Sequence, residues 1–140
     1  MNVKVNELMT ESVVTAQPHH TVEHVRKLLE NNKVSAVPVV DSENSPVGVI
    51  SATDLVRDLK SGTPISNLMT EKVYTVPQYD DVSTAARVMR NHKIHHLVVT
   101  DEQKVVGVLS SFDLLKLLEG RRFVAKGAPT PSRRKGSKRV

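Results

Sequence analysis

An internal repeat with a period of about 60 residues constrains the fold of this chain more than any other feature. The sequence Leu-Met-Thr-Glu at residues 8–11 returns at residues 68–71. After a polar turn at residues 42–45 the offset falls to 59, and the later matching pairs are Gly48 with Gly107, Ser51 with Ser110 and Asp54 with Asp113. A length change confined to a turn is expected between two copies of one fold, since loops tolerate insertions and deletions. The repeat therefore predicts two copies of one structural unit.

Each copy carries the same order of hydrophobic patterns. A short apolar lead-in precedes a β-branched stretch, and an amphipathic helix follows, with Thr21 and Asp81 as its predicted N-caps. Gly62 and Gly120 follow the closing helices, where we expect left-handed C-terminal caps. The predicted elements are strands at 13–15, 37–40 and 47–50 with a closing helix at 54–59, and strands at 73–76, 97–99 and 105–109 with a closing helix at 113–118.

This order defines a β-α-β-β-α unit that has too few strands to bury both faces of its sheet. We therefore expect an α/β (α+β) fold in which two units pack sheet to sheet with pseudo-twofold symmetry. The predicted boundaries are 1–62 for the first unit, 63–120 for the second and 121–140 for a basic tail. Pro38 lacks a backbone N–H, so its strand is predicted to lie at an edge or to carry a bulge.

The tail differs from the rest of the chain in charge. Residues 121–140 hold 8 of the 20 Lys and Arg and none of the 15 Asp and Glu, so residues 1–120 have a net charge of −3 and the tail has +8. The tail is rich in Pro, Gly and Ser, and we expect it to be largely disordered. It is either an electrostatic arm for nucleic acid, an anionic membrane or an acidic partner, or a solvated end that aids solubility.

The sequence argues against several classes of function. We do not expect an enzyme, because the chain has no Gly-x-Ser-x-Gly elbow, Walker loop or paired carboxylates with a clear role. The absence of cysteine excludes disulfides and Cys-based zinc sites, and His19, His20 and His24 lack a carboxylate to complete a metal site, so no metal is predicted. The 3% of aromatic residues argues against stacking platforms for single-stranded nucleic acid. No apolar run has the length of a membrane span or a signal peptide core, so we expect a cytoplasmic protein.

Taken together, these motifs resemble those of the CBS-pair family, also called the Bateman module. The family features are a Met-Thr lead-in, a strand ending in Thr, a Pro-Val-Val-Asp-type strand and a Gly-x-x-[Ser/Thr]-x-x-[Asp/Asn] turn that opens the last helix. The resemblance covers roughly residues 5–119, and copy two departs from it in the strand that lacks proline. The matching segments are Met9-Thr10, Thr15, Pro38–Asp41 and Gly48–Asp54 in copy one, and Met69-Thr70, Thr75, Val98–Asp101 and Gly107–Asp113 in copy two.

The turn after each glycine has the chemistry to hold a sugar phosphate. A helix N-terminus leaves backbone N–H groups unpaired and favours phosphate. A serine hydroxyl there can donate to phosphate or ribose, and a carboxylate three residues on can accept from both ribose hydroxyls. The alternative is that the serines only cap the closing helices and the carboxylates support the first turn. The resemblance implies the ligand role, and the candidate residues are Ser51, Asp54, Ser110 and Asp113, together with Thr15 and Thr75.

The resemblance also implies two clefts with apolar walls for an adenine base. For each wall residue, an ordinary place in the core is the alternative. His95 and His96 stand at a strand entrance where some family members carry a His-Arg pair that meets phosphates. Since copy one has no histidine there, one cleft should bind a phosphorylated ligand better, and binding should rise as pH falls toward a histidine pKa of about 6.5; the alternative is a surface histidine pair. The predicted walls are Val14, Ala16, Val37 and Pro38 in one cleft and Tyr74, Val76, Leu97 and Val98 in the other.

The function implied is a non-catalytic regulatory module that binds an adenosyl ligand and transmits its occupancy to a partner protein. AMP, ADP and ATP are the first candidates, and S-adenosylmethionine and NAD are further ones. The resemblance also implies a homodimer. The alternative function is a ligand-free dimerisation protein whose basic tail contacts nucleic acid or an acidic partner.

Overall fold

The computed structural model describes residues 2–11, 14–56, 60–70 and 72–119. Within these residues the chain is a mixed α/β protein built from two similar halves, as the repeat predicted. Copy one contains α1 (Val5–Leu8), β1 (Thr10–Glu11), α2 (Val22–Asn32), β2 (Ala36–Val40), β3 (Pro46–Ser51) and the 3-10 helix η1 (Ala52–Leu55). Copy two contains the 3-10 helix η2 (Ile65–Asn67), β4 (Thr75–Pro77), α3 (Val82–His92), β5 (His96–Asp101), β6 (Lys104–Ser110), α4 (Ser111–Leu114) and α5 (Lys116–Glu119).

The two amphipathic helices begin where the sequence predicted. Thr21 Oγ1 accepts a hydrogen bond from the His24 N–H at 3.2 Å, and the Asp81 carboxylate accepts from the Ser83 N–H at 2.8 Å. Both helices end at a lysine in the left-handed conformation, Lys33 or Lys93.

Of the two glycine caps predicted after the closing helices, Gly62 lies within the described residues, and there the prediction is wrong. Gly62 does not have a left-handed φ, and it lies in a turn in which the Thr63 N–H donates to the Lys60 carbonyl at 3.0 Å. The closing segment of copy one is a single 3-10 turn over Ala52–Leu55, while residues 57–59 and Gly120 lie outside the described residues.

Two sheets form, of four strands in the order β1-β6-β5-β4 and of two strands, β2 and β3. β4 runs parallel to β5, and the Val98 N–H donates to the Tyr74 carbonyl at 3.2 Å. Pro38 has no N–H for the equivalent bond, so the first strand of copy one is reduced to a single bridge between Ala16 and Val39. β2 also carries the bulge that proline predicted, between Val39 and Val40.

The lead-in of each copy pairs with the sheet of the other copy. In copy one, Thr10 of β1 pairs with Val108 of β6, and Thr70 of copy two forms the equivalent bridge to Val49 of β3. Gly107 makes this crossing possible, because a Cβ there would lie 2.6 Å from the Met9 sulfur and 2.8 Å from the Thr10 carbonyl oxygen. Gly48 faces the second lead-in in the same way. At each of these glycines, the close approach is therefore made by the lead-in of the other copy.

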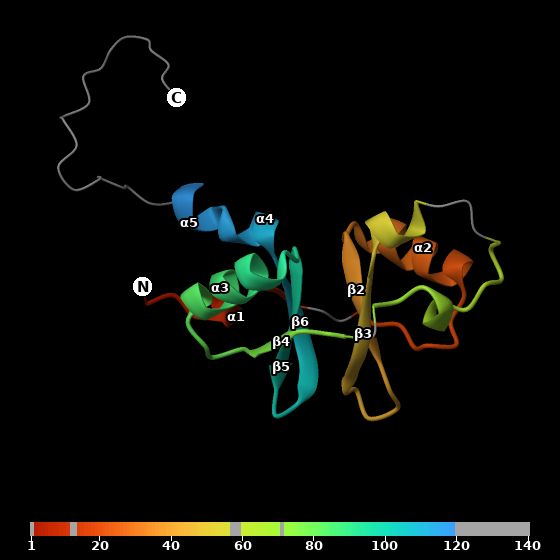
Figure 1. Ribbon diagram of the computed structural model, residues 1–140, viewed down its shortest axis with the longest axis horizontal. Helices are drawn as coiled ribbons and strands as arrows, with labels where there is room; N and C mark the ends of the chain where they lie inside the picture. Colours follow the sequence, from red (N-terminus) through yellow and green to blue (C-terminus); the bar gives the residue numbers. More distant parts are fainter. Residues whose placement is uncertain (1, 12–13, 57–59, 71, 120–140) are drawn as a thin grey trace, which may run out of the picture.

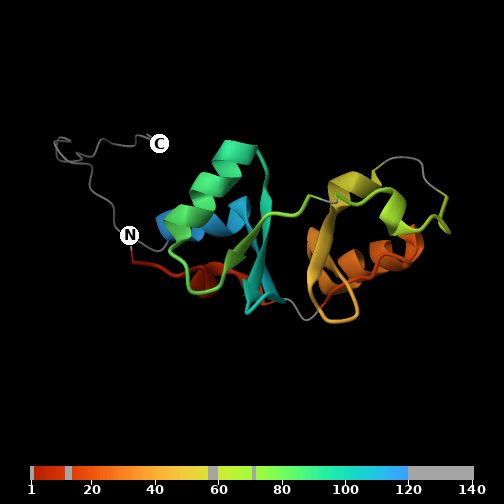
Figure 2. The ribbon, with the colours of Figure 1, turned by 60° about the horizontal axis from the view of Figure 1, so that its bottom comes forward.

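The sheets face each other in the middle of the molecule, and the helices cover their outer faces (Figures 1 and 2). Each half has its own aliphatic core, and each core includes the other copy's lead-in, with Val5 and Leu8 in one and Ile65 in the other. Between the sheets, Val40 packs with Val98 and Val105. None of the helices in the described part of the chain is long and apolar enough to cross a membrane.

Candidate functional site

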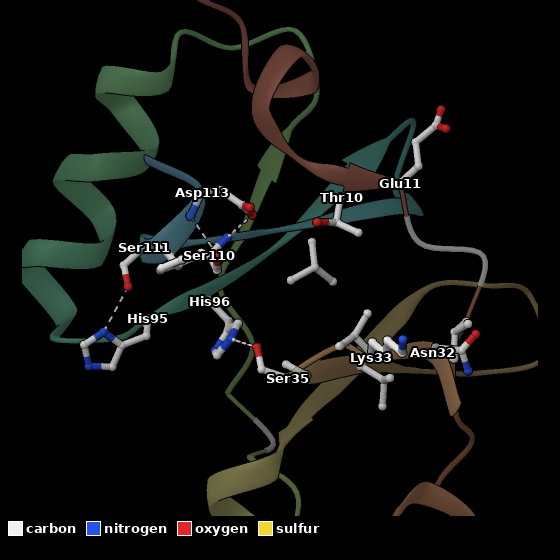
Figure 3. A pocket seen from close by; sticks show the side chains of 16 residues that line it. Thr10, Glu11, Asn32, Lys33, Ser35, His95, His96, Ser110, Ser111 and Asp113 are labelled. Atoms are coloured by element: carbon white, nitrogen blue, oxygen red, sulfur yellow. Dashed lines mark hydrogen bonds between the residues drawn. The ribbon is translucent and has the colours of Figure 1, made fainter. Parts of the chain in front are cut away.

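A cavity of about 730 Å³ opens between the two copies, on the side of the molecule where the closing helices begin. Figure 3 shows Asp113, Ser110 and Ser111 along one side, and Ser35, Lys33 and Asn32 along the facing side. This volume lies within the range of small-molecule sites, about 300–1,000 Å³. The wall residues are Thr10, Glu11, Val14, Asn32, Lys33, Val34, Ser35, Ala36 and Val37 from copy one, and His95, His96, Val108, Ser110, Ser111, Phe112 and Asp113 from copy two.

The turn from β6 into α4 places a hydroxyl and a carboxylate side by side in this wall. The Ser110 backbone N–H donates to Asp113 Oδ2 at 2.9 Å, and Ser110 Oγ accepts from the Asp113 N–H at 3.0 Å. These reciprocal bonds form a capping box that fixes both side chains. The capping role that the sequence offered as an alternative is therefore present, and it holds the two groups in position for a ligand.

Asp113 is the more buried of the two equivalent carboxylates. Only 8% of Asp113 is exposed, and its Oδ1 lies 3.3 Å from Lys116 Nζ. The Lys116 ammonium also donates to the Leu8 carbonyl at 3.2 Å. A carboxylate can accept about four hydrogen bonds, so Asp113 keeps capacity for a hydroxyl that enters the cavity.

The two histidines of the strand entrance reach both copies. His96 Nε2 lies 3.1 Å from Ser35 Oγ of copy one, and His95 Nδ1 lies 3.3 Å from Ser111 Oγ. Burial is the main cause that lowers the pKa of His96 below 6.5, and His95 lowers this pKa further, while Asp113 and Asp54 act in the opposite direction. With its pKa below 6.5, less than half of His96 is protonated at pH 6.5, so a charge on it toward a phosphate requires a lower pH than the sequence predicted.

The equivalent turn of copy one lies outside the cavity wall. The Ser51 backbone N–H donates to Asp54 Oδ2 at 2.8 Å, and the Ser51 hydroxyl donates to the same oxygen at 3.2 Å. Asp54 is half-buried and does not line the cavity.

The structure thus brings together six of the sixteen predicted site residues in one cavity. Val14 and Val37 supply apolar surface from copy one, next to the polar groups of copy two. Three further predicted wall residues, Ala16, Val76 and Leu97, are buried in the aliphatic cores, and Val98 is buried between the sheets. Pro38 is buried in β2, Thr15 is half-buried, Thr75 is exposed and Tyr74 stacks on His92. The six predicted site residues that do line the cavity are Val14, Val37, His95, His96, Ser110 and Asp113.

Several wall residues were not among the predicted site residues. Lys33 and Asn32 end α2 and bring an ammonium and an amide to the cavity. Lys33 recurs as Lys93 in the repeat, and this recurrence directly after a helix was a signal that could have found it. Thr10 and Glu11 could not be found from the pattern of one copy, because their lead-in crosses to the other copy's sheet.

Three of the histidines outside the cavity, His19, His20 and His24, form a ring cluster. The ring centres of His19 and His24 lie 4.6 Å and 4.3 Å from that of His20, whose Nδ1 accepts from the Gln17 N–H at 2.9 Å. Burial is the main cause that lowers the pKa of His20, with His24 and His19 adding to it. Among the residues the structure describes, no three metal-ligating side chains are placed to hold a metal ion. The basic tail, 121–140, lies outside the described residues.

Comparison with known proteins matches both halves of the chain to one family, the CBS domain, at residues 5–61 and 65–120. The chain is 30% identical over 124 residues to a 17.7 kDa protein of Acidianus ambivalens, covering 84% of this chain and 74% of that protein. It is 38% identical over 112 residues to the inosine-5'-monophosphate dehydrogenase of Halobacterium salinarum, covering 78% of this chain and 22% of that enzyme. The chain thus spans about a fifth of the dehydrogenase's length.

Solved structures show the same architecture. The CBS domain pair of protein MJ0100, in complex with 5'-methylthioadenosine and S-adenosyl-L-methionine, superposes with a TM-score of 0.79 at 25% identity, covering 87% of this chain and all of that one. A putative acetoin utilization protein, AcuB, from Vibrio cholerae superposes with a TM-score of 0.72 at 27% identity, covering 85% of this chain and 92% of that one.

Proposed function

The chain belongs to the CBS domain family as a tandem pair, and we propose from this premise that it is a non-catalytic regulatory module that binds an adenosyl ligand in the cavity between its copies. The boundaries 1–62, 63–120 and 121–140 and a cytoplasmic location are part of this proposal. The observation that carries it is one cavity that combines apolar walls, a hydroxyl–carboxylate turn and the ammonium of Lys33.

The chemistry of each wall fits one part of an adenosyl ligand. Val14, which packs against the core that contains the buried Val37, offers apolar surface to a base, and the buried carboxylate of Asp113 accepts the ribose hydroxyls. Lys33 and the two histidines line the remaining wall, where they face a phosphate or another polar extension from the ribose. AMP, ADP and ATP are the proposed ligands, with S-adenosylmethionine and NAD as the further ones, and a solved relative holds S-adenosyl-L-methionine and 5'-methylthioadenosine.

Regulation follows from the position of the cavity between the copies. A ligand that touches both halves changes their relative geometry to the extent that it binds one arrangement more tightly. A partner protein, or a second copy of the chain, then reads this geometry. Exposed apolar side chains of the closing segments offer a surface for a homodimer, namely Val56, Phe112, Leu115 and Leu118.

A thermal-shift panel of AMP, ADP, ATP, S-adenosylmethionine and NAD tests the proposal. A ligand present at about 100 times its Kd stabilises the folded state by about 2.7 kcal/mol, which is several degrees in Tm for a domain of this size. If none of the five raises Tm, and the chain instead binds DNA or RNA in a salt-sensitive way that is lost on deletion of 121–140, the ligand-free alternative is correct.

A further inference from the structure

The repeat relates every wall residue of the cavity to a counterpart on the other side of the pseudo-twofold axis. Lys33 corresponds to Lys93, and Asp113 corresponds to Asp54. A second cavity of the same shape is therefore expected from the backbone alone. The side chains that would line it differ at ten of the sixteen wall positions. At two of these positions an aromatic ring takes the place of a smaller side chain and the two rings contact each other, namely Tyr74 in place of Val14 and His92 in place of Asn32.

The backbones of the two positions are equivalent, so the difference lies in the side chains. α2 and α3 end in the same left-handed conformation, with φ of 54° at Lys33 and 57° at Lys93. The backbone N–H to carboxylate bond of the closing turn is 2.8 Å long at Ser51 and 2.9 Å at Ser110. The Tyr74 carbonyl accepts from the Val98 N–H, which places Tyr74 in register beside β5.

The rings of Tyr74 and His92 stack on each other in the position of the second cavity. Their centres are 4.1 Å apart and their planes are tilted by 24°. The Lys72 ammonium lies 5.8 Å from the centre of the Tyr74 ring, which is half-buried against the core of copy two. Two stacked rings thus stand where the first cavity has the smaller side chains of Val14 and Asn32.

The polar turn on this side is also engaged within the protein. The Ser51 hydroxyl donates to Asp54 Oδ2 at 3.2 Å, whereas Ser110 Oγ accepts from the Asp113 backbone N–H at 3.0 Å. Both the base position and the hydroxyl of the second cavity are therefore occupied by the chain's own groups.

We propose that the Tyr74–His92 stack closes the second cavity from within, so that the chain binds one adenosyl ligand and not two, with Tyr74 as the residue that sets this number. The inference rests on the proposed function, because it concerns the same ligand class. It also implies that a small side chain at position 74 opens a second site between Lys93 and Asp54.

Binding stoichiometry tests this inference, measured by equilibrium dialysis with AMP and with S-adenosylmethionine as probes. We expect one equivalent per chain for the natural sequence and two for the double variant Tyr74→Val with His92→Asn, which replaces the two stacked rings by the side chains that copy one carries at these two positions. Val14→Tyr is the matched control, and it should reduce one equivalent to none. Combining all three substitutions should restore one equivalent, now bound on the other side.

The outcomes separate the inference from the proposed function. Two equivalents on the natural sequence, or one on a double variant that melts cooperatively, overturn the inference and leave the proposed function standing. Absence of binding to every variant overturns both. If the double variant fails to fold, the single variant Tyr74→Val, which also removes the ring stack, replaces it. Loss of the stack then has to give a second, weaker equivalent, and its absence overturns the inference.

Discussion

Replacing one of the two equivalent carboxylates should abolish the ligand response, while replacing the other should not. Asp113 and Asp54 both close a capping turn onto a serine backbone N–H, at 2.9 Å and 2.8 Å, but only Asp113 lines the cavity. Asp113→Ala and Asp54→Ala therefore remove the same local support, and each should cost about 0.5–2 kcal/mol of folding stability. The Lys116 ion pair of Asp113 adds little to this, because such half-exposed pairs contribute about 0–1 kcal/mol.

The effect on binding follows from the bonds that the carboxylate offers to a ribose. A hydrogen bond to a charged group contributes about 1.5–3 kcal/mol, which corresponds to about 10- to 150-fold in Kd. At a ligand concentration of about 100 times the natural Kd, the stabilisation of about 2.7 kcal/mol falls to about 0.4 kcal/mol when binding weakens about 100-fold. Asp54→Ala should keep the full response.

Differential scanning fluorimetry with and without the ligand, at matched protein concentration, measures both effects at once. The ligand-free Tm of the two variants should fall by similar amounts. The ligand-induced rise should persist in Asp54→Ala and nearly vanish in Asp113→Ala. The reasoning is wrong if Asp113→Ala keeps the rise in Tm, or if Asp54→Ala loses it to the same extent.

Three further predictions concern packing, pH and assembly. Gly107→Ala should destabilise the fold by about 1–3 kcal/mol in urea denaturation, because its Cβ would lie 2.8 Å from the Thr10 carbonyl oxygen, and Gly62→Ala, with nothing near its Cβ, is the control that should cost nothing. The free energy of unfolding should fall as pH drops below 6.5, because the lowered pKa values of His20 and His96 mean that the unfolded state takes up protons first. A chain in which both histidines are replaced by Asn should show a smaller fall, and an equal fall would contradict the assignment. The double variant Phe112→Ser with Leu118→Ser should shift a dimer toward monomer in sedimentation velocity, because these apolar side chains are 76% and 68% exposed on the closing helices. The control variant Tyr79→Ser, at a position that is 63% exposed but lies outside the closing helices, should leave the assembly unchanged.

The elements of the fold could be predicted from the sequence because each depends on local signals. Thr21 and Asp81 cap helices through bonds to residues two or three positions away, and the strand patterns depend on alternation within a few residues. The repeat added long-range information, since two similar units have to share their buried faces. The left-handed ends at Lys33 and Lys93 were missed because lysine carries no preference for that conformation.

The site was harder to predict because its walls come from different copies. The sequence grouped Val14 with Ala16 and Pro38 in one cleft, because the resemblance places a base against the first strand and the proline-bearing strand of the same copy. The fold buries Ala16 and Pro38 and places Val14 opposite Ser110 and Asp113 of copy two. A pattern read one copy at a time gives the residue types of such a cavity, but the pairing of walls depends on how the copies cross.

The two copies agree where they interlock and differ where they form the cavity. Met9 and Thr10 lie over Gly107, just as Met69 and Thr70 lie over Gly48, so a larger side chain at either glycine would displace the backbone of the other copy.

Val14 lines the cavity, and Tyr74 stands at the equivalent position of copy two, where it stacks on His92 of the same copy. Under the proposed function, divergence at these positions would change ligand binding on one side of the molecule. A ligand between Val14 of copy one and Asp113 of copy two would contact both halves, so its binding free energy would depend on their relative placement. Under the same proposal, this dependence would let one occupied cavity alter the surface that a partner contacts.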